Sequence, residues 1–279
     1  MVEEPFAGWN GDWIDMPPRN VIPKPHQKPH PPLWVACSQR ETIHLAATKG
    51  IGALTFAFVE PSEARHWVDD YYSTIATEEC VPAGFAVNAN PASVLPLMRH
   101  EDEATAIDRG LDGAHFFGYS LGHFYGFGNH QPGVTDIHEQ FLANRTLFGF
   151  DREAAAQVGV GLRARMTKEA DGMDEGIASL RGAIGTPDQI RDLLLDYEAA
   201  GVDQVIFISQ AGHTRHEHIC ESIELFAREV MPEFAERDLA HVAAKEAGLA
   251  DSVSAALARR DPPRTADPEY RIPPPVGTS

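Results

Sequence analysis

The sequence predicts an α/β fold in which short parallel strands alternate with helices. Residues 33–37 and 204–209 are apolar runs with the length of strands that are buried on both faces. Apolar residues then recur at helical spacing, at 41–48 after the first run and at 221–234 after the second. A strand that leads into a helix is the repeating unit of parallel sheets, so we expect one such sheet.

The remaining elements follow from the same patterns. Seven prolines within 17–32 keep the approach to the first strand extended. Residues 151–183 are polar and predict a surface excursion. In chain order, strands are expected at 33–37, 53–58, 85–94 and 204–209 with a further candidate at 114–117, and helices at 41–48, 61–79, 102–109, 137–148, 187–200 and 221–234.

One of these helices has both ends marked in the sequence. Thr186 precedes it and supplies a side-chain oxygen for capping, and Pro187 occupies the first helical position. Gly201 follows the last turn, where glycine ends a helix without strain. By composition, we expect three regions: a Pro-rich extension at 1–32, one α/β domain at 33–234, and at 235–279 an Ala-rich helix followed by a disordered tail.

The overall composition argues against several classes of function. A formal charge of −18 and a pI near 5.0 argue against nucleic acid or an anionic membrane as a partner. Three widely spaced cysteines, Cys37, Cys80 and Cys220, favour neither a disulfide framework nor a cysteine-rich zinc site. No secretory leader opens the sequence and no apolar run reaches about 18 residues, so we expect a cytoplasmic protein.

The turn after the first strand is a candidate phosphate site. The strand ends at Cys37-Ser38, just before a helix, so a hydroxyl, free backbone N–H groups and the positive end of the helix meet at one point. Two plainer interpretations compete with this one. Ser38 is also an ordinary residue for a helix cap, and Cys37 also fits as a small buried side chain.

Two blocks of the sequence resemble one family. Residues 31–47 contain Pro-Pro-Leu-Trp-Val-Ala-Cys-Ser and Glu-Thr-Ile-His-Leu-Ala-Ala, and they resemble the fifth strand and helix of the bacterial luciferase-like flavin monooxygenases. Residues 185–190, 201–208 and 221–234 are similar to the last helix, strand and helix of that family. The blocks stand in the family's order, and the similarity extends from about residue 5 to about residue 235.

This resemblance implies a (β/α)8 barrel of the TIM type, of which the chain holds only a part. Family members place four strands before the block at residue 33, and only 32 residues precede that block here. The four or five strands expected in this chain cannot close an eight-stranded barrel. We therefore expect an incomplete, C-terminal half-barrel.

The resemblance also implies a flavin site at the carboxyl ends of the strands. The pair Cys37-Ser38 matches residues at the flavin ring edge, and Ser38 with Thr42 is the candidate phosphate contact. Phe56 is a candidate wall of the flavin pocket, with simple core packing as the alternative. After the last strand, the candidate flavin contacts are Gln210 and Gly212.

A segment rich in aromatic residues and glycine, 115–130, matches the place of a mobile substrate cover in the family. The resemblance implies a lid there, and the alternative is a core surface that packs on the absent half. The candidate lid residues are His115, Tyr119, His123 and Tyr125.

The histidines after the last strand do not suggest a metal site. His216 and His218 lie two apart at a helix start and would point to different sides, so no metal is expected there.

The activity that the resemblance implies is a flavin-dependent monooxygenation. Reduced FMN and O2 would oxygenate an apolar small molecule, and a family member that uses a deazaflavin would transfer hydride without O2. The alternative is a non-catalytic partner subunit or truncated paralogue that assembles with another barrel half. A half-barrel exposes two sheet edges and an apolar face, so we expect a homo- or hetero-oligomer in either case.

Overall fold

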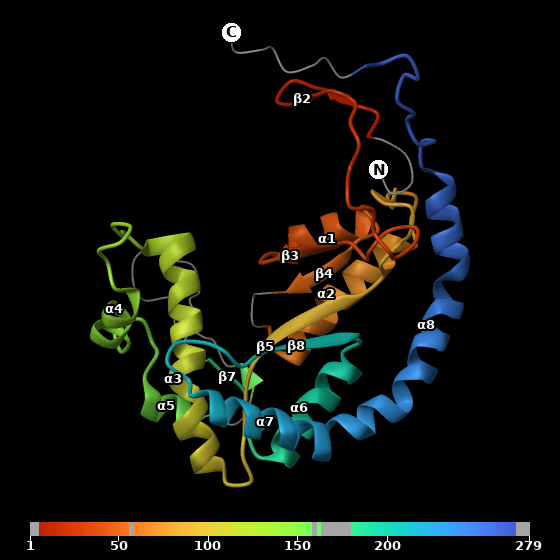
Figure 1. Ribbon diagram of the computed structural model, residues 1–279. Helices are drawn as coiled ribbons and strands as arrows, with labels where there is room; N and C mark the ends of the chain where they lie inside the picture. The colour runs from red at the N-terminus through yellow and green to blue at the C-terminus, as the bar shows by residue number, and fades with distance from the viewer. Residues whose placement is uncertain (1–5, 56–58, 158–160, 163–179, 272–279) are drawn as a thin grey trace.

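A computed structural model describes residues 6–55, 59–157, 161–162 and 180–271 (Figure 1). The strands are β1 (Trp9–Asn10), β2 (Asp15–Met16), β3 (Trp34–Cys37), β4 (Gly52–Thr55), β5 (Pro91–Arg99), β6 (Gly161–Leu162), β7 (Leu180–Gly185) and β8 (Gln204–Ile208). The helices are α1 (Arg40–Thr48), α2 (Pro61–Ile75), α3 (Glu103–Gly122), α4 (Ile137–Asn144), α5 (Arg152–Gln157), α6 (Pro187–Ala199), α7 (His216–Glu229) and α8 (Met231–Ala258), with a π-helical turn, η1 (His123–Phe127), after α3.

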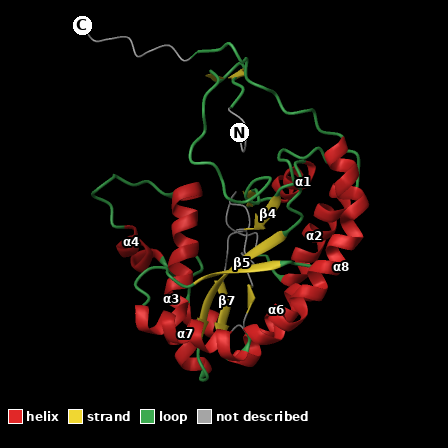
Figure 2. Cartoon of the chain, turned by 45° about the vertical axis from the view of Figure 1, so that its right-hand side comes forward, coloured by secondary structure: helices red, strands yellow, loops and turns green. Residues whose placement is uncertain are grey.

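The central sheet contains four neighbouring parallel strands, β3, β4, β5 and β8. The last residues of β5 also pair with β7, and β6 adds a short antiparallel edge to β7. In the described part of the chain, β3 pairs only with β4, and β8 pairs only with β5, so the sheet stays open. The expected α/β half-barrel is therefore confirmed. Figure 2 shows this sheet between α3 and α4 on one side and α2, α6 and α8 on the other.

Strand β5 forms the centre of the core. All nine of its residues are buried, and both α3 and α7 pack against it. The sequence pattern had predicted this strand at 85–94, which is partly wrong, since it starts at Pro91 and continues to Arg99. Pro91 tolerates the first position of a strand, and Pro96 lacks only one ladder donor, so neither proline prevents pairing.

Helix α3 is longer than the sequence predicted. It includes residues 114–117, so the strand expected there is wrong. Gly110 and Gly113 lie within this helix and allow close packing. A Cβ at Gly110 would lie 2.2 Å from the Cβ of Met98 on β5, and one at Gly113 would lie 2.9 Å from the Ala211 carbonyl oxygen.

Strand β7 lies where the sequence predicted a surface excursion, so that prediction is wrong for residues 180–183. Arg181 is buried, with 1% of its surface exposed, and Arg181 Nε donates to the Ile184 carbonyl oxygen at 2.9 Å. The Arg181 guanidinium also pairs with Glu103 Oε1 on α3 at 2.5 Å. Residues 163–179 lie outside the described part.

The signals at both ends of α6 are confirmed. The Thr186 hydroxyl accepts from the Gln189 N–H at 3.4 Å, and the Thr186 N–H donates to the Gln189 side chain at 3.0 Å, which completes a capping box. Gly201 has a φ of +86°, a left-handed conformation that favours glycine.

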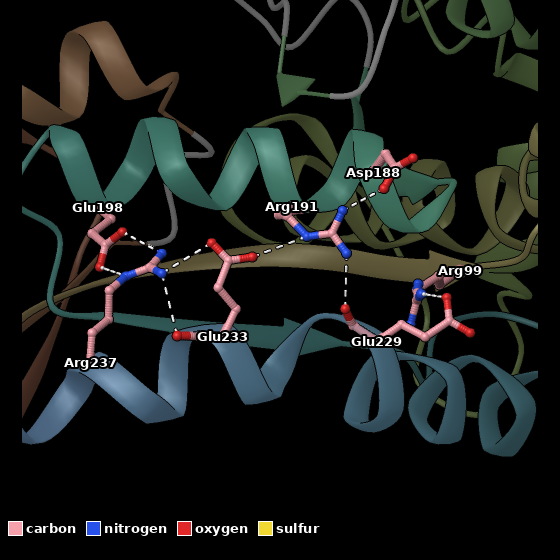
Figure 3. Close-up of polar contacts among 7 residues, drawn as sticks. All are labelled: Arg99, Asp188, Arg191, Glu198, Glu229, Glu233 and Arg237. Carbon is pink, nitrogen blue, oxygen red and sulfur yellow. Dashed lines mark hydrogen bonds and ion pairs between the residues drawn. The ribbon is translucent and has the colours of Figure 1, made fainter.

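Helices α6, α7 and α8 are joined by a chain of ion pairs (Figure 3). Arg237 makes two bonds of 2.8 Å to Glu198 on α6 and a third of 3.0 Å to Glu233. Arg191 reaches Glu233 at 3.1 Å. At the far end, Arg99 donates to Glu229 at 2.8 Å, which ties the end of β5 to α7.

The N-terminal residues form an arm that extends away from the sheet (Figure 1). Its β1–β2 hairpin exposes Trp13 and Ile14, and Ile22 is 80% exposed. Across the described residues, no helix combines the length and apolarity that crossing a bilayer requires.

Candidate functional site

The turn between β3 and α1 brings three of the candidate residues together. Cys37 ends β3, Ser38 is exposed in the turn, and Thr42 lies in the first turn of α1. Gln39, not Ser38, is the N-cap residue, and its side chain makes no capping hydrogen bond. The interpretation of Ser38 as an ordinary cap is therefore wrong, and Ser38 is an exposed residue beside the start of the helix.

The start of α1 has the electrostatics of an anion site. The N–H groups of Arg40 and Glu41 lie in the first turn, where a helix offers them no internal acceptor. The helix dipole adds positive potential there, and the Arg40 side chain is 59% exposed. Asp70 lies 3.4 Å from Arg40 and Glu41 is in the same turn, so both carboxylates weaken the attraction for an anion.

The Cys37 thiol is a packing group at neutral pH. Its side chain is fully buried, and burial raises the pKa of the thiol to about 11. The Cys37 Sγ lies 3.5 Å from the Val35 carbonyl oxygen. A thiol with this pKa is not a thiolate nucleophile, so Cys37 can contribute shape to a neighbouring site but no charge.

The hydroxyl groups of Thr55 and Ser93, on the strands next to Cys37, make hydrogen bonds within the sheet. The strand register places Cys37 opposite Thr55, and Thr55 opposite Ser93. Thr55 Oγ1 donates to the Ala92 carbonyl oxygen at 3.1 Å and lies 3.3 Å from Ser93 Oγ. These side chains are therefore satisfied without a ligand. Phe56, the candidate pocket wall, lies outside the described residues.

Gln210 and Gly212 lie in the loop after β8, apart from the β3–α1 turn. Strands β4 and β5 stand between β3 and β8, a separation of about 14 Å at the usual spacing of strands. Gly212 has a φ of +57° and lies against Phe116 of α3. Ala211 and Thr214 line a cavity of about 10 Å³ with Gly113 and Phe117. This loop therefore packs on α3, and a single copy does not bring all the candidates together.

Three of the four candidate lid residues are buried. His115 and Tyr119 on α3 are 0% and 2% exposed, and His123 at the start of η1 is 2% exposed, whereas Tyr125 in η1 is 87% exposed. The Tyr119 ring contacts the rings of Phe141 and Phe148, with 5.6 Å between centroids in each pair. The segment forms an aromatic cluster with α4, so its buried face is core, and a role as a lid remains a prediction.

His115 is an unusual member of that cluster. Neither of its ring nitrogens has a hydrogen-bond partner among the described residues. Burial lowers its pKa to about 4, and the charge of Arg145 acts in the same direction. Arg145 itself pairs with Asp112 at 2.8 Å. His115 is therefore a neutral imidazole at pH 7, available as a weak donor or acceptor rather than as a charge.

A histidine that the sequence did not indicate lies beside the β8 loop. The His138 ring on α4 lies against the His213 ring, with centroids 3.9 Å apart. The two residues are far apart in the sequence, so no local pattern could have identified the pair. Within the described ranges, no group of three or more His, Cys, Asp or Glu side chains could hold a metal ion.

Comparison with known proteins identifies the family of this chain. The sequence model for luciferase-like monooxygenases matches residues 1–204. The chain belongs to this family. The family inferred from the two sequence blocks is therefore confirmed.

Solved structures support the fold of the luciferase-like half-barrel. Monooxygenase RslO1 from Streptomyces bottropensis is 18% identical, with a TM-score of 0.51, over 84% of this chain and 57% of that protein. The coenzyme F420-dependent tetrahydromethanopterin reductase from Methanopyrus kandleri is 17% identical, with a TM-score of 0.50. The match covers 81% of this chain and 57% of that protein. An uncharacterised protein of Sinorhizobium fredii, y4wF, is 34% identical over 92 residues, which are 33% of this chain and 24% of that protein. The chain thus spans little more than half the length of these solved structures.

The residues of this luciferase-like chain fit one end of a flavin better than the other. The exposed Ser38 hydroxyl and the first turn of α1 suit a phosphate, because N–H donors and positive potential converge there. The described cavities do not join this turn to Gln210. A cavity of about 350 Å³ lies instead at the amino ends of the strands, between residues 27–32 and 86–88.

Proposed function

We propose that this chain contributes to a flavin-dependent oxidoreductase that uses reduced FMN and O2 to oxygenate an apolar small molecule. Family membership supports the reaction class. The observation that carries the proposal is the exposed Ser38 hydroxyl beside the uncapped start of α1, at the carboxyl end of a parallel strand. Ligand sites of parallel α/β folds form at this end of the strands.

Each residue of the β3–α1 turn has a defined part in the proposal. The Ser38 hydroxyl and the N–H groups of Arg40 and Glu41 would hold the phosphate, and Arg40 would add charge attraction. Cys37 would pack as a neutral thiol beneath the ring edge. The aromatic cluster around Tyr119 would exclude water from the reacting end. A bound reduced flavin would supply the electrons for O2 activation, and a deazaflavin would supply a hydride instead.

A titration with two cofactors tests this function. We expect FMN or the deazaflavin F420 to bind, and Ser38→Ala to weaken binding by roughly 10- to 100-fold, because a hydrogen bond to a charged group is worth about 1.5–3 kcal/mol. Ser62→Ala is the matched control, since Ser62 is exposed at the start of α2 in the next strand–helix unit. If both variants bind as the wild type does, the phosphate site is elsewhere.

The second candidate function is that of a partner subunit without its own activity. The open outer edges of β3 and β8 favour it, because unpaired strand edges attract other chains. A chain that assembles but binds neither cofactor would support this candidate over the enzyme.

A further inference from the structure

The four parallel strands of the sheet end in two free edges. Among the described residues, the outer edge of β3 and the outer edge of β8 pair with nothing. Both edges belong to parallel strands, so each can accept another parallel neighbour. A barrel of this type closes with eight parallel strands, which is twice the number in the run β3-β4-β5-β8.

The face of the sheet that would point into a barrel is exposed at both of these edges. The strand registers place Ala36, Leu54, Ala92 and Gln204 in one row. Residues two positions along share that face, so Trp34 and Ile206 also lie on it. Trp34 is 37% exposed and Ile206 is 42% exposed. The apolar side chains without cover thus lie on the two edge strands.

The size of this face shows that it needs a second contact region. Four strands of about five residues present roughly 300 Å², whereas a standard interface buries about 800 Å² per partner. The N-terminal arm can supply the rest. Trp9 and Trp13 are 50% and 95% exposed, which adds about 350 Å² at roughly 250 Å² for a tryptophan. Ile14 and Ile22, 59% and 80% exposed, bring the total to standard size.

Charge also favours this arm as a contact to a second copy. The whole chain carries −18, so two copies repel each other over most of their surfaces. Residues 1–34 differ, because three basic side chains, Arg19, Lys24 and Lys28, nearly balance the four acidic ones, Glu3, Glu4, Asp12 and Asp15. A nearly neutral, aromatic arm therefore meets less repulsion from the acidic body of another copy than the rest of the surface does.

We propose that two copies of this chain close one barrel about a twofold axis. Strand β8 of each copy pairs with β3 of the other, and each arm lies on its partner. A twofold axis along the barrel keeps all eight strands parallel and makes the two junctions identical. Both free edges and both exposed inner faces are then buried.

This assembly completes the candidate site, a step that rests on the proposed function. Within one copy, Ser38 and Gln210 lie at opposite edges of the sheet. Across a β8–β3 junction, the loop that holds Gln210 and Gly212 lies beside the Ser38 turn of the partner copy. The cofactor site of the dimer would therefore take its phosphate end from one copy and a wall from the other.

The first test is the mass of the full chain in solution, measured by light scattering across a range of concentrations. We expect a dimer, and we expect Ile206→Lys to be a monomer because it places a charge on the buried face. Ile223→Lys is the matched control, since Ile223 is 49% exposed on α7. Trp34→Lys repeats the test from β3 if Ile206→Lys fails to fold. A monomeric wild type overturns the proposal.

Crosslinking tests the arrangement itself. Chains with Ala36→Cys and chains with Ile206→Cys, both with Cys220→Ser, carry different tags and are mixed with a short bismaleimide. We expect crosslinks between the two kinds of chain, because β3 meets β8 at each junction. Crosslinks mainly within one kind would overturn this pairing. Neither readout requires a cofactor, so a dimer that binds no flavin refutes the enzyme and leaves the assembly standing.

Discussion

Cys37 and Ser38 are neighbours in the chain with opposite surroundings. Cys37 points into the core with a pKa of about 11, and Ser38 lies in the exposed turn. The end of β3 explains the contrast, since successive strand residues face opposite sides. The buried Cys37 thiol and the exposed Ser38 residue suit a site whose base is apolar and whose solvent-facing edge is polar.

His115 makes the stability of the protein depend on pH. Its pKa is 6.5 in an ordinary setting and about 4 in the folded chain, so the unfolded chain binds more protons between these values. Folding stability is therefore complete above about pH 6.5 and falls as the pH is lowered toward 4, by up to roughly 3 kcal/mol. Urea unfolding at several pH values measures this slope.

The variant His115→Leu removes the titrating group and should flatten that part of the slope. The control His66→Gln changes an exposed histidine on α2 and should leave the slope as in the wild type. An unchanged slope in His115→Leu would mean that another group causes the acid sensitivity.

At the scale of elements, the glycines of α3 decide how closely it approaches the sheet. Glycine is a poor helix former, yet Gly110 lies where the helix meets Met98. The local preference is overridden by packing, because only a residue without a Cβ fits this contact. The helix in turn seals the carboxyl end of β5 beside the β8 loop.

A pair of glycine substitutions should show opposite effects. Gly110→Ala places a Cβ 2.2 Å from Met98 and should lower the free energy of unfolding by about 2 kcal/mol or more. Gly248→Ala in α8 meets nothing within 4 Å and should raise it by up to about 1 kcal/mol. Thermal and denaturant unfolding of both variants check this. Equal changes in the free energy of unfolding for the two variants would show that α3 packs less closely against β5 than this contact implies.

The success of the sequence analysis differed between elements for physical reasons. The strands β3 and β8 and the caps of α6 were predictable, because short apolar runs and Thr-Pro signals are local. Strand β7 was not, since Arg181 looks like a surface residue until Glu103 and the Ile184 carbonyl oxygen satisfy it. The same holds for α3, where the partners of its glycines are distant in sequence.

The candidate site was predictable only in part. The Cys37-Ser38 turn follows directly from a strand and a helix that adjoin in sequence. The relation between Ser38 and Gln210 depends on where β8 inserts, beside β5 and not beside β3. The rings of His115 and Tyr119 both lie against Phe150, and Tyr119 also lies against Phe141 of α4, contacts that no pattern in 115–130 reveals.

At the scale of the whole molecule, the long helix α8 lies along the side of the sheet that holds α2 and α6, and we call it the strap (Figure 1). Lys245 donates to Asp203 at 2.8 Å just before β8, and Arg259 donates to the Cys80 carbonyl oxygen at 3.0 Å. Together with the ion pairs of Figure 3, these bonds connect the last helix to both halves of the sheet.

Removal of Arg237 tests this strap. Arg237→Met loses the two-pronged bond to Glu198 and should lower the free energy of unfolding by about 1 kcal/mol at low salt. The difference should shrink at about 1 M NaCl, where charges are screened. Arg228→Met is the control, because Arg228 is 62% exposed and its ion pair is with the next residue in the chain, Glu229. If the loss of unfolding free energy is the same at low and high salt, side-chain packing rather than the ion pair causes it.

The position of β5 has a consequence for the synthesis of this protein. The strand is complete at Arg99, but its neighbour β8 begins only at Gln204. A ribosome that adds about 5–20 residues per second needs roughly 5 to 20 seconds to make the intervening chain. During that interval, one edge of this fully buried strand stays open on the nascent polypeptide. We therefore expect newly made chains to aggregate less when a holding chaperone covers this edge until residue 208 has emerged.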